Sequence, residues 1–268
     1  MKYIKPSDAN RSDILAATAY KTPADEIVFE TTPSVQGCTF LDHLILLYGA
    51  PKIGKSTLFS KFPGVYFLPT EPGFKALKVR KTEIPNWQTF RKFIEWAEKH
   101  PSAIADVKLW CIDTVTNLSK FCMQWVCGRE GISHPSDQEW GKGWEAYADE
   151  FAFWILRLAH LRKGIGFIAH SNTTEIVSRH VKITKNIPDI PKTCYRLINN
   201  LADVIVEMNY VDKGENLEKL GEMRCLFTKP SEIRDAGDRT GRLPEVIEFK
   251  TESVAVMKIL RCFRDEAK

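Results

Sequence analysis

Residues 44–58 read LILLYGAPKIGKSTL, and this stretch decides the fold. Its apolar start is too short to span a membrane and is typical of a buried parallel strand, and it leads directly into the pattern G-x-x-x-x-G-K-S. A short helix is expected from about Lys55 to Lys61, because Phe62-Pro63-Gly64 would end it. Strand, glycine-containing loop and helix in this order predict a phosphate-binding loop.

The residue types of this loop indicate its chemistry. Two glycines let backbone N–H groups turn inward around anionic oxygens, and the positive end of the following helix adds attraction. The Lys55 ammonium would then reach the β- and γ-phosphates, and the Ser56 hydroxyl would be a ligand of Mg²⁺. The alternative is a turn with an exposed lysine. The predicted ligands are ATP and Mg²⁺, and the predicted phosphate-binding residues are Gly49, Ala50, Pro51, Lys52, Ile53, Gly54, Lys55, Ser56 and Thr57.

Bulk properties indicate a globular protein of one large domain or two small ones, with 268 residues of which 44% are hydrophobic. The net charge of +4 is too small to indicate a nucleic-acid partner by itself. Seven cysteines without a C-x-x-C pair suggest neither a zinc site nor disulfides, which fits a reducing cytoplasm. The polar amino terminus is unlike a signal peptide, and no apolar run is long enough to span a membrane. We therefore expect a cytoplasmic protein without a membrane partner.

Strands alternate with helices over the first 170 residues, which predicts an α/β fold with a mainly parallel sheet flanked by helices. Antiparallel strands are expected at one edge, from the last third of the chain. We expect residues 1–38 to form an N-terminal arm that docks on a neighbouring subunit, or a small element that packs on its own domain, and residues 39–268 to form the main domain. Further strands are expected at 65–68, 107–113, 166–170, 203–208, 224–228 and 246–249, helices near 86–100, 118–125, 144–162, 193–201 and 253–264, and loops at 128–143 and 171–191.

Two carboxylates follow predicted strands, where ligands collect in open α/β sheets. Asp113 is a candidate Mg²⁺ residue together with Ser56, and the alternative is a helix N-cap. Glu71 is a candidate for orienting, or partly deprotonating, the water that attacks the γ-phosphate. Its alternative is an ordinary surface glutamate in a Pro/Gly turn.

His170 ends another predicted strand and leads into the basic stretch that follows. A side chain bonded to the γ-phosphate there would place the next segment in one position with ATP and release it after hydrolysis. The alternative is a structural histidine.

Basic residues gather in two predicted loops. Cations supply phosphate contacts and an aromatic side chain can stack a base, which is the combination that single-stranded nucleic acid binding needs. The alternative is a solvated face. The candidate DNA-binding residues are Arg129, Trp140, Lys142, Arg179, Lys182 and Lys185.

A second basic cluster, Arg239-Thr240-Gly241-Arg242, lies near an expected edge strand. Arg239 and Arg242 are candidates for arginine fingers that reach the γ-phosphate on a neighbouring subunit. A solvated turn with compensating acidic residues is the alternative.

The ordered set GAPKIGKST, TEPGF, LWCIDT and FIAH resembles the core of RecA-type recombination ATPases. The short spacings and the ending AGDRTGRLP are similar to compact phage-encoded members associated with single-strand annealing. Over residues 40–250 the resemblance implies a RecA-like ATPase domain with Lys55, Glu71 as catalytic glutamate, Asp113 as Mg²⁺ residue and His170 as sensor. It also implies a single-stranded-DNA-binding homo-oligomer in the host cytoplasm, with a single-strand-binding protein as an open candidate partner.

The sequence departs from that family in two ways. The sensor is usually an amide side chain, whereas here it is His170, and the chain has no room for a separate amino-terminal helical DNA-binding domain. We therefore expect annealing rather than full strand exchange. The rival functions are a small-molecule phosphotransferase, a helicase-like motor or loader, and a nucleotide-gated module without hydrolysis.

Overall fold

The computed structural model describes residues 39–177, 182–211 and 223–264, all within one compact unit, Gly37–Lys268. The predicted arm at 1–38 and the candidate Arg179 lie outside the described residues. Within these residues, no helix is both long and apolar enough to cross a membrane.

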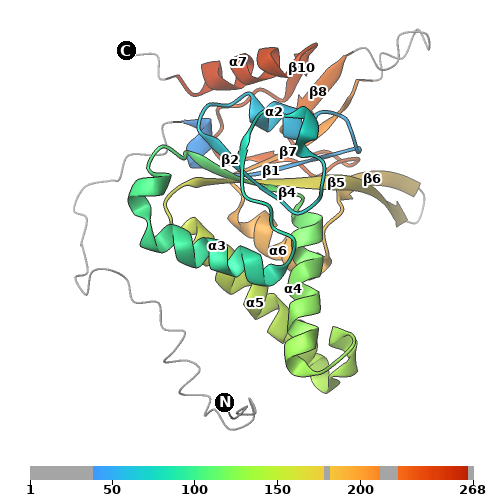
Figure 1. Ribbon diagram of the computed structural model, residues 1–268. Coiled ribbons are helices and arrows are strands. Elements are labelled where there is room, and N and C mark those ends of the chain that lie inside the picture. Colours follow the sequence, from blue (N-terminus) through green and yellow to red (C-terminus); the bar gives the residue numbers. More distant parts are fainter. Residues whose placement is uncertain (1–38, 178–181, 212–222, 265–268) are drawn as a thin grey trace, which may run out of the picture. The chain divides into compact units, whose positions relative to one another are not determined.

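A single sheet organises the described part of the chain (Figure 1). Its strand order is β3-β2-β4-β5-β1-β7-β8-β10, with β6 paired to β5 and β9 paired to β7. Pairing is parallel from β3 through to β7, whereas β6, β8, β9 and β10 pair antiparallel. The predicted fold class is therefore confirmed. The strands are β1 (Leu44–Gly49), β2 (Val65–Pro69), β3 (Arg80–Lys81), β4 (Leu109–Asp113), β5 (Gly164–Val177), β6 (Lys182–Pro188), β7 (Val204–Tyr210), β8 (Arg224–Phe227), β9 (Gly237–Asp238) and β10 (Val246–Phe249).

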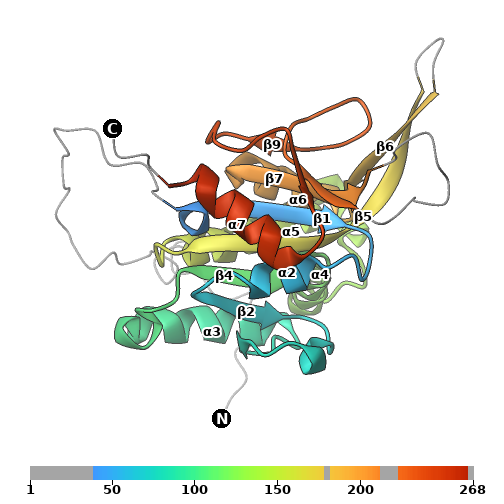
Figure 2. The same ribbon diagram turned by 90° about the horizontal axis from the view of Figure 1, so that it is seen from above.

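Helices cover both faces of this sheet, with α3, α4, α5 and α6 on one face and α2 and α7 on the other (Figures 1 and 2). Side chains along β1 point alternately to the two faces of the sheet. Leu46 and Tyr48 pack into the hydrophobic core on one face, and Ile45 and Leu47 pack into the core on the other. The helices are α2 (Lys55–Ser60), α3 (Trp87–Lys99), α4 (Val115–Glu130), α5 (Lys142–Ala159), α6 (Lys192–Leu201) and α7 (Glu252–Cys262).

Local sequence explains where the longer helices begin and end. The Asn86 side chain accepts a hydrogen bond from the Thr89 N–H and caps α3. Helix α4 begins after Thr114 and ends at Gly131, whose φ of 68° is the left-handed conformation that glycine adopts readily. Helix α7 buries Ala255 and other apolar residues against its own domain, so the tail helix is part of the core.

The structure contradicts the expected loop at 171–191. Strand β5 continues past His170 to Val177 and pairs antiparallel with β6, so this stretch contains a β-hairpin. Its β-branched residues favour strands, but most of its side chains are exposed or half-buried, so no apolar periodicity marks it in the sequence.

The expected loop at 128–143 is also partly wrong. Arg129 belongs to the last turn of α4, and Lys142 is the first residue of α5. Between the helices lie two short 3₁₀ turns, Pro135–Asp137 and Glu139–Gly141.

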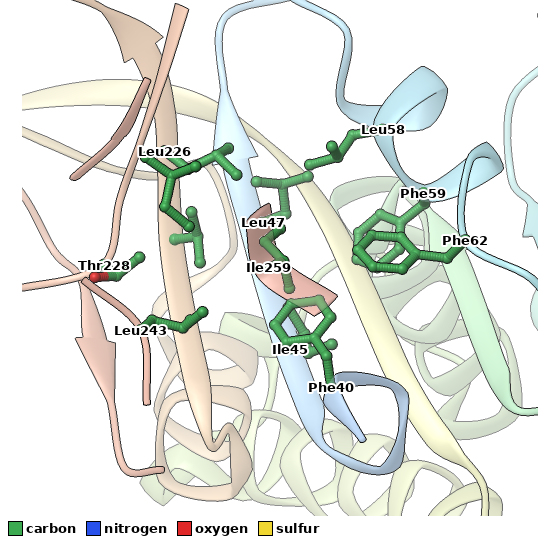
Figure 3. A pocket seen from close by; sticks show the side chains of 12 residues that line it. Phe40, Ile45, Leu47, Leu58, Phe59, Phe62, Leu226, Thr228, Leu243 and Ile259 are labelled. Atoms are coloured by element: carbon green, nitrogen blue, oxygen red, sulfur yellow. The ribbon is translucent and has the colours of Figure 1, made fainter. Parts of the chain in front are cut away.

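A small cavity lies between β1, α2 and the antiparallel edge (Figure 3). Its volume is about 20 Å³, room for about one water molecule. Its walls are apolar side chains such as Phe40, Leu47 and Phe59, and the Thr228 hydroxyl donates to the Pro244 carbonyl at 2.6 Å. This cavity is a gap in core packing and offers no phosphate-binding group.

Candidate nucleotide site

The phosphate loop joins the end of β1 to the start of α2, as the sequence predicts. Gly49 lies so close to β7 that a Cβ there would come within 2.3 Å of the Met208 carbonyl oxygen, so a side chain would displace the strand. Gly54 precedes α2 with a φ of 113°, which L side chains rarely adopt. The glycines of the motif are therefore required by close approach and by backbone conformation.

The Lys55 side chain is folded back along the loop. It is buried, and its Nζ donates hydrogen bonds of 2.8 Å to the carbonyl oxygens of both Gly49 and Ala50. Burial lowers the pKa of Lys55 to about 8, while the carboxylates of Asp113 and Glu71 act in the opposite direction. The ammonium group thus lies in the loop, within the electrostatic reach of both predicted acidic residues.

Asp113 ends β4 and meets the first turn of α2. The Ser56 hydroxyl donates to its Oδ2 at 2.5 Å. Burial raises the pKa of Asp113, although the Ser56 hydrogen bond and the Lys55 charge act against this shift. A hydroxyl and a carboxylate are hard oxygen ligands, and Mg²⁺ is typically held by one or two such groups together with substrate phosphates. Ser56 and Asp113 therefore fit the predicted Mg²⁺ site.

Glu71 follows β2 and lies beside the start of α4. Its Oε1 accepts hydrogen bonds from the Thr114 hydroxyl at 3.1 Å and from the Asn117 side-chain amide at 2.7 Å. The backbone is fixed by Thr70, whose hydroxyl donates to the Thr114 carbonyl at 2.9 Å. These contacts hold the exposed Glu71 carboxylate at the same sheet edge as Asp113, because β2 and β4 pair in register there.

Asn117 is a residue that sequence reasoning did not single out. It lies in the first turn of α4, four positions after Asp113, and its hydrogen bond to Glu71 is shorter than the one from Thr114. The sequence signal that could have identified Asn117 is its position one helical turn after Asp113, the carboxylate that ends a strand.

His170 lies beside the phosphate loop, because β5 pairs with β1 so that His170 is the partner of Gly49. Its Nδ1 is buried, and among the described residues no group hydrogen bonds to it. Its backbone carbonyl accepts from the N–H of Asp189, which directly follows β6 at the base of the hairpin, at 2.8 Å. We call the sheet edge that carries Lys55, Glu71 and Asp113 the phosphate edge. His170 therefore lies where β5 leaves the phosphate edge and enters the hairpin.

Two DNA-binding candidates in the hairpin, Lys182 and Lys185, lie within the described residues, and both are paired with carboxylates. Lys182 forms an ion pair with Glu175 at 2.8 Å, and Lys185 forms one with Asp235 at 2.5 Å. The hairpin thus carries less uncompensated positive charge than its sequence suggests.

The other three DNA-binding candidates lie elsewhere. Arg129 pairs with Glu130 and Glu150, while Trp140 is 92% exposed in the turn before α5 and Lys142 is exposed beside it. Helix α4 has 16 residues and is therefore about 24 Å long, which separates this turn from the sheet edge. The hairpin and the α4–α5 turn lie apart in Figure 1, so these candidates do not form one surface.

The candidate arginine fingers lie in a turn organised by Asp238. Its carboxylate accepts from the backbone N–H groups of Thr240 and Leu243, both at 2.9 Å. The Arg239 guanidinium donates to the Asn200 carbonyl at 2.9 Å, and Arg242 lies over the Phe263 ring at 5.3 Å.

A buried polar cluster fixes the base of the hairpin to the central strands. Glu207 on β7 is 1% exposed and accepts hydrogen bonds from Asn186 at 2.8 Å and from Arg234 at 2.9 Å. Tyr48, directly before the phosphate loop, donates from its hydroxyl to the Asp235 carbonyl at 2.6 Å. Asn186 therefore joins the hairpin to β7, and Asp235, which bonds to Tyr48 of β1, is joined to the hairpin by its ion pair with Lys185.

Comparison with known proteins identifies the class. The family model described as AAA domain matches residues 42–240, which contain the loop, both carboxylates and His170. The chain belongs to this family, and with its phosphate loop it is a P-loop ATPase domain. No curated protein matches the chain.

Two solved structures are similar in fold. The flagellar accessory protein FlaH from Methanocaldococcus jannaschii is 13% identical, with a TM-score of 0.43, over 78% of this chain and 85% of that chain. The KaiC-like protein PH0186 from Pyrococcus horikoshii OT3 is 11% identical, with a TM-score of 0.40, over 70% of this chain and 78% of that chain.

Proposed function

We propose that this AAA domain ATPase is an ATP- and Mg²⁺-dependent recombination ATPase that binds single-stranded DNA and anneals it as a homo-oligomer. The observation that carries the proposal is the continuity of β5. The strand passes His170 beside the phosphate loop and continues into the hairpin, where the sequence carries its basic residues. A change at the γ-phosphate would therefore reach the hairpin through one strand.

The chemistry assigned to this site is hydrolysis by an oriented water. Thr114 and Asn117 hold the Glu71 carboxylate, which accepts a proton from the attacking water. Lys55 leaves the Gly49 and Ala50 carbonyls to bind phosphate oxygens, since a triphosphate offers it stronger, charge-assisted hydrogen bonds. Ser56 and Asp113 would hold Mg²⁺, which neutralises phosphate charge when bound.

Arg239 and Arg242 are proposed to act as arginine fingers on the γ-phosphate of a nucleotide bound by a neighbouring subunit. Both come from the turn that Asp238 organises, so the backbone that presents them is ordered. The proposed partners are single-stranded DNA, further copies of this chain and a single-strand-binding protein.

One assay tests the proposal: ATP hydrolysis by the full chain with and without single-stranded DNA, together with its mass in solution. The expected result is an oligomer whose turnover rises several-fold with DNA. ATP turnover that does not change when DNA is added would instead favour a phosphotransferase. Strand unwinding would favour a helicase-like motor, and nucleotide binding without hydrolysis would favour a nucleotide-gated module. Any of these three results would contradict the proposal.

A further inference from the structure

Arg224 reaches the phosphate loop from outside the motif. It begins β8, and its Nη1 donates to the Ile53 carbonyl at 2.8 Å and to Glu252 Oε1 at 2.5 Å. Its Nη2 donates to the Lys250 carbonyl at 3.2 Å, and the guanidinium lies 5.0 Å from the centre of the Phe249 ring. One side chain therefore joins the loop to the end of β10 and the start of α7.

The loop packs directly on this ion pair. A Cβ built at Gly54 would come within 2.5 Å of Arg224 Nη1 and within 2.6 Å of Glu252 Oε1. The two side chains are largely buried, at 19% and 16% exposed. Although burial acts to raise it, the pKa of Glu252 lies below its usual value because Arg224 donates to the charged form. Both members of the pair are thus held charged, against the loop.

The geometry of the peptide bond gives this contact a consequence for the ligand side of the loop. The only cis bond among the described residues is Asp113–Thr114, so the bond between Ile53 and Gly54 is trans. In a trans peptide the C=O and N–H groups point in opposite directions. The bond from Arg224 to the Ile53 carbonyl therefore turns the Gly54 N–H away from Arg224. Backbone N–H groups of this loop are the donors that surround phosphate oxygens.

We propose that Arg224, anchored by Glu252, is a positioning residue that fixes the Ile53–Gly54 peptide of the phosphate loop in its nucleotide-binding orientation. Arg224 acts through the loop rather than on the substrate. The inference rests on nucleotide binding by the loop and not on the DNA-binding part of the proposed function.

The test compares Arg224→Ala and Arg224→Lys with a matched control, Lys258→Ala. Lys258 also joins α7 to β10, through a 2.8 Å hydrogen bond to the Glu248 carbonyl, whereas Arg224 bonds to the loop itself. The dissociation constants of ATP and ADP with Mg²⁺, KM, kcat and Tm are measured on the full chain without DNA. A lost charge-assisted hydrogen bond predicts about tenfold weaker nucleotide binding and a KM raised by a similar factor. Since this binding is uniform between ground and transition states, kcat stays within about twofold.

The lysine variant separates geometry from charge. It keeps the positive charge but lacks the planar fork that bonds Ile53, Glu252 and Lys250 together, so it should bind nucleotide nearly as weakly as the alanine variant. Full affinity in Arg224→Lys would overturn the proposal, because charge alone would then suffice. Lys258→Ala should leave the dissociation constants unchanged, and an equal loss there would also overturn it.

A second variant keeps the test decisive if Arg224→Ala does not fold. Glu252→Gln preserves the shape of the anchor and removes its charge, so about threefold weaker nucleotide binding is expected. Unchanged affinity in a folded Glu252→Gln and in any folded Arg224 variant would reject the positioning role. DNA-stimulated turnover by the wild type together with that result would reject this inference alone, whereas weakened binding in the variants without DNA stimulation would reject only the recombination proposal.

Discussion

The phosphate edge and the hairpin are both reached by β5, yet their charges are arranged differently. At the edge, Lys55, Asp113 and Glu71 converge because parallel strands end on the same side of the sheet. In the hairpin, Lys182 and Lys185 are each neutralised by a carboxylate of the same chain. Strand register thus brings functional groups together, whereas a basic run in the sequence need not give a basic surface.

The largest effect is expected at the phosphate edge itself. Lys55→Ala removes the buried ammonium and its charge-assisted bonds to phosphate, which predicts about a hundredfold weaker ATP binding or more, and turnover below detection. Titration calorimetry with ATP and Mg²⁺ measures the affinity. Lys61→Ala, an exposed lysine just after α2, serves as control and should bind ATP normally. Near-normal ATP affinity in Lys55→Ala would contradict this prediction, because the buried lysine of the phosphate edge would then matter no more than the paired lysines of the hairpin.

The pKa of Lys55 gives the phosphate edge its own pH dependence. Its value in the folded protein, about 8, lies below the ordinary 10.5, so the folded state binds fewer protons between these pH values. The stability lost by burying the charged lysine is therefore recovered as pH rises through that window. Nucleotide needs the charged form, so above pH 8 binding must take up a proton, and affinity should fall about tenfold from pH 7 to pH 9.

The same titration of Lys55→Ala should lack that step. A wild-type affinity that is flat between pH 7 and pH 9 would show that Lys55 keeps its charge in the free protein.

A smaller effect is expected at the hairpin. Lys182→Gln should weaken single-stranded DNA binding about fivefold at 0.1 M salt and reduce the salt slope by about 0.7, the contribution of one phosphate contact. Lys182 is preferred to Lys185 because changing Lys185 would leave the half-buried Asp235 without its cation. Fluorescence anisotropy with a labelled oligonucleotide gives both quantities.

Glu175→Gln is the matched variant for this pair. It releases Lys182 from its carboxylate and should tighten DNA binding. If neither variant changes the affinity, DNA binds elsewhere, and the exposed Trp140 turn becomes the next region to test.

The strand, loop and helix around Lys55 could be predicted from the sequence because their signals are local. G-x-x-x-x-G-K-S fixes Gly49, Gly54 and Lys55 within one strand, loop and helix, and a carboxylate after a buried strand points to the sheet edge. The α/β class and the antiparallel edge followed from alternating elements. The edge strand β10 was found at its observed bounds.

The sequence could not predict contacts between distant segments. The hairpin lacks apolar alternation because most of its residues are exposed, so it looked like a loop. Arg224 and Ile53 are 171 positions apart, and no local pattern links them. The pairing of Lys185 with Asp235 likewise depends on tertiary structure, so the charge cluster was overestimated.

We propose that Glu71, held by Thr114 and Asn117, orients the attacking water at a nucleotide bound in the phosphate loop. The direct measurement compares ATP affinity and single-turnover hydrolysis in wild type and Glu71→Gln. We expect Glu71→Gln to keep an unchanged dissociation constant for ATP and to hydrolyse it about 10²- to 10⁴-fold more slowly. Normal hydrolysis in the variant would contradict it and remove Glu71 from the reaction.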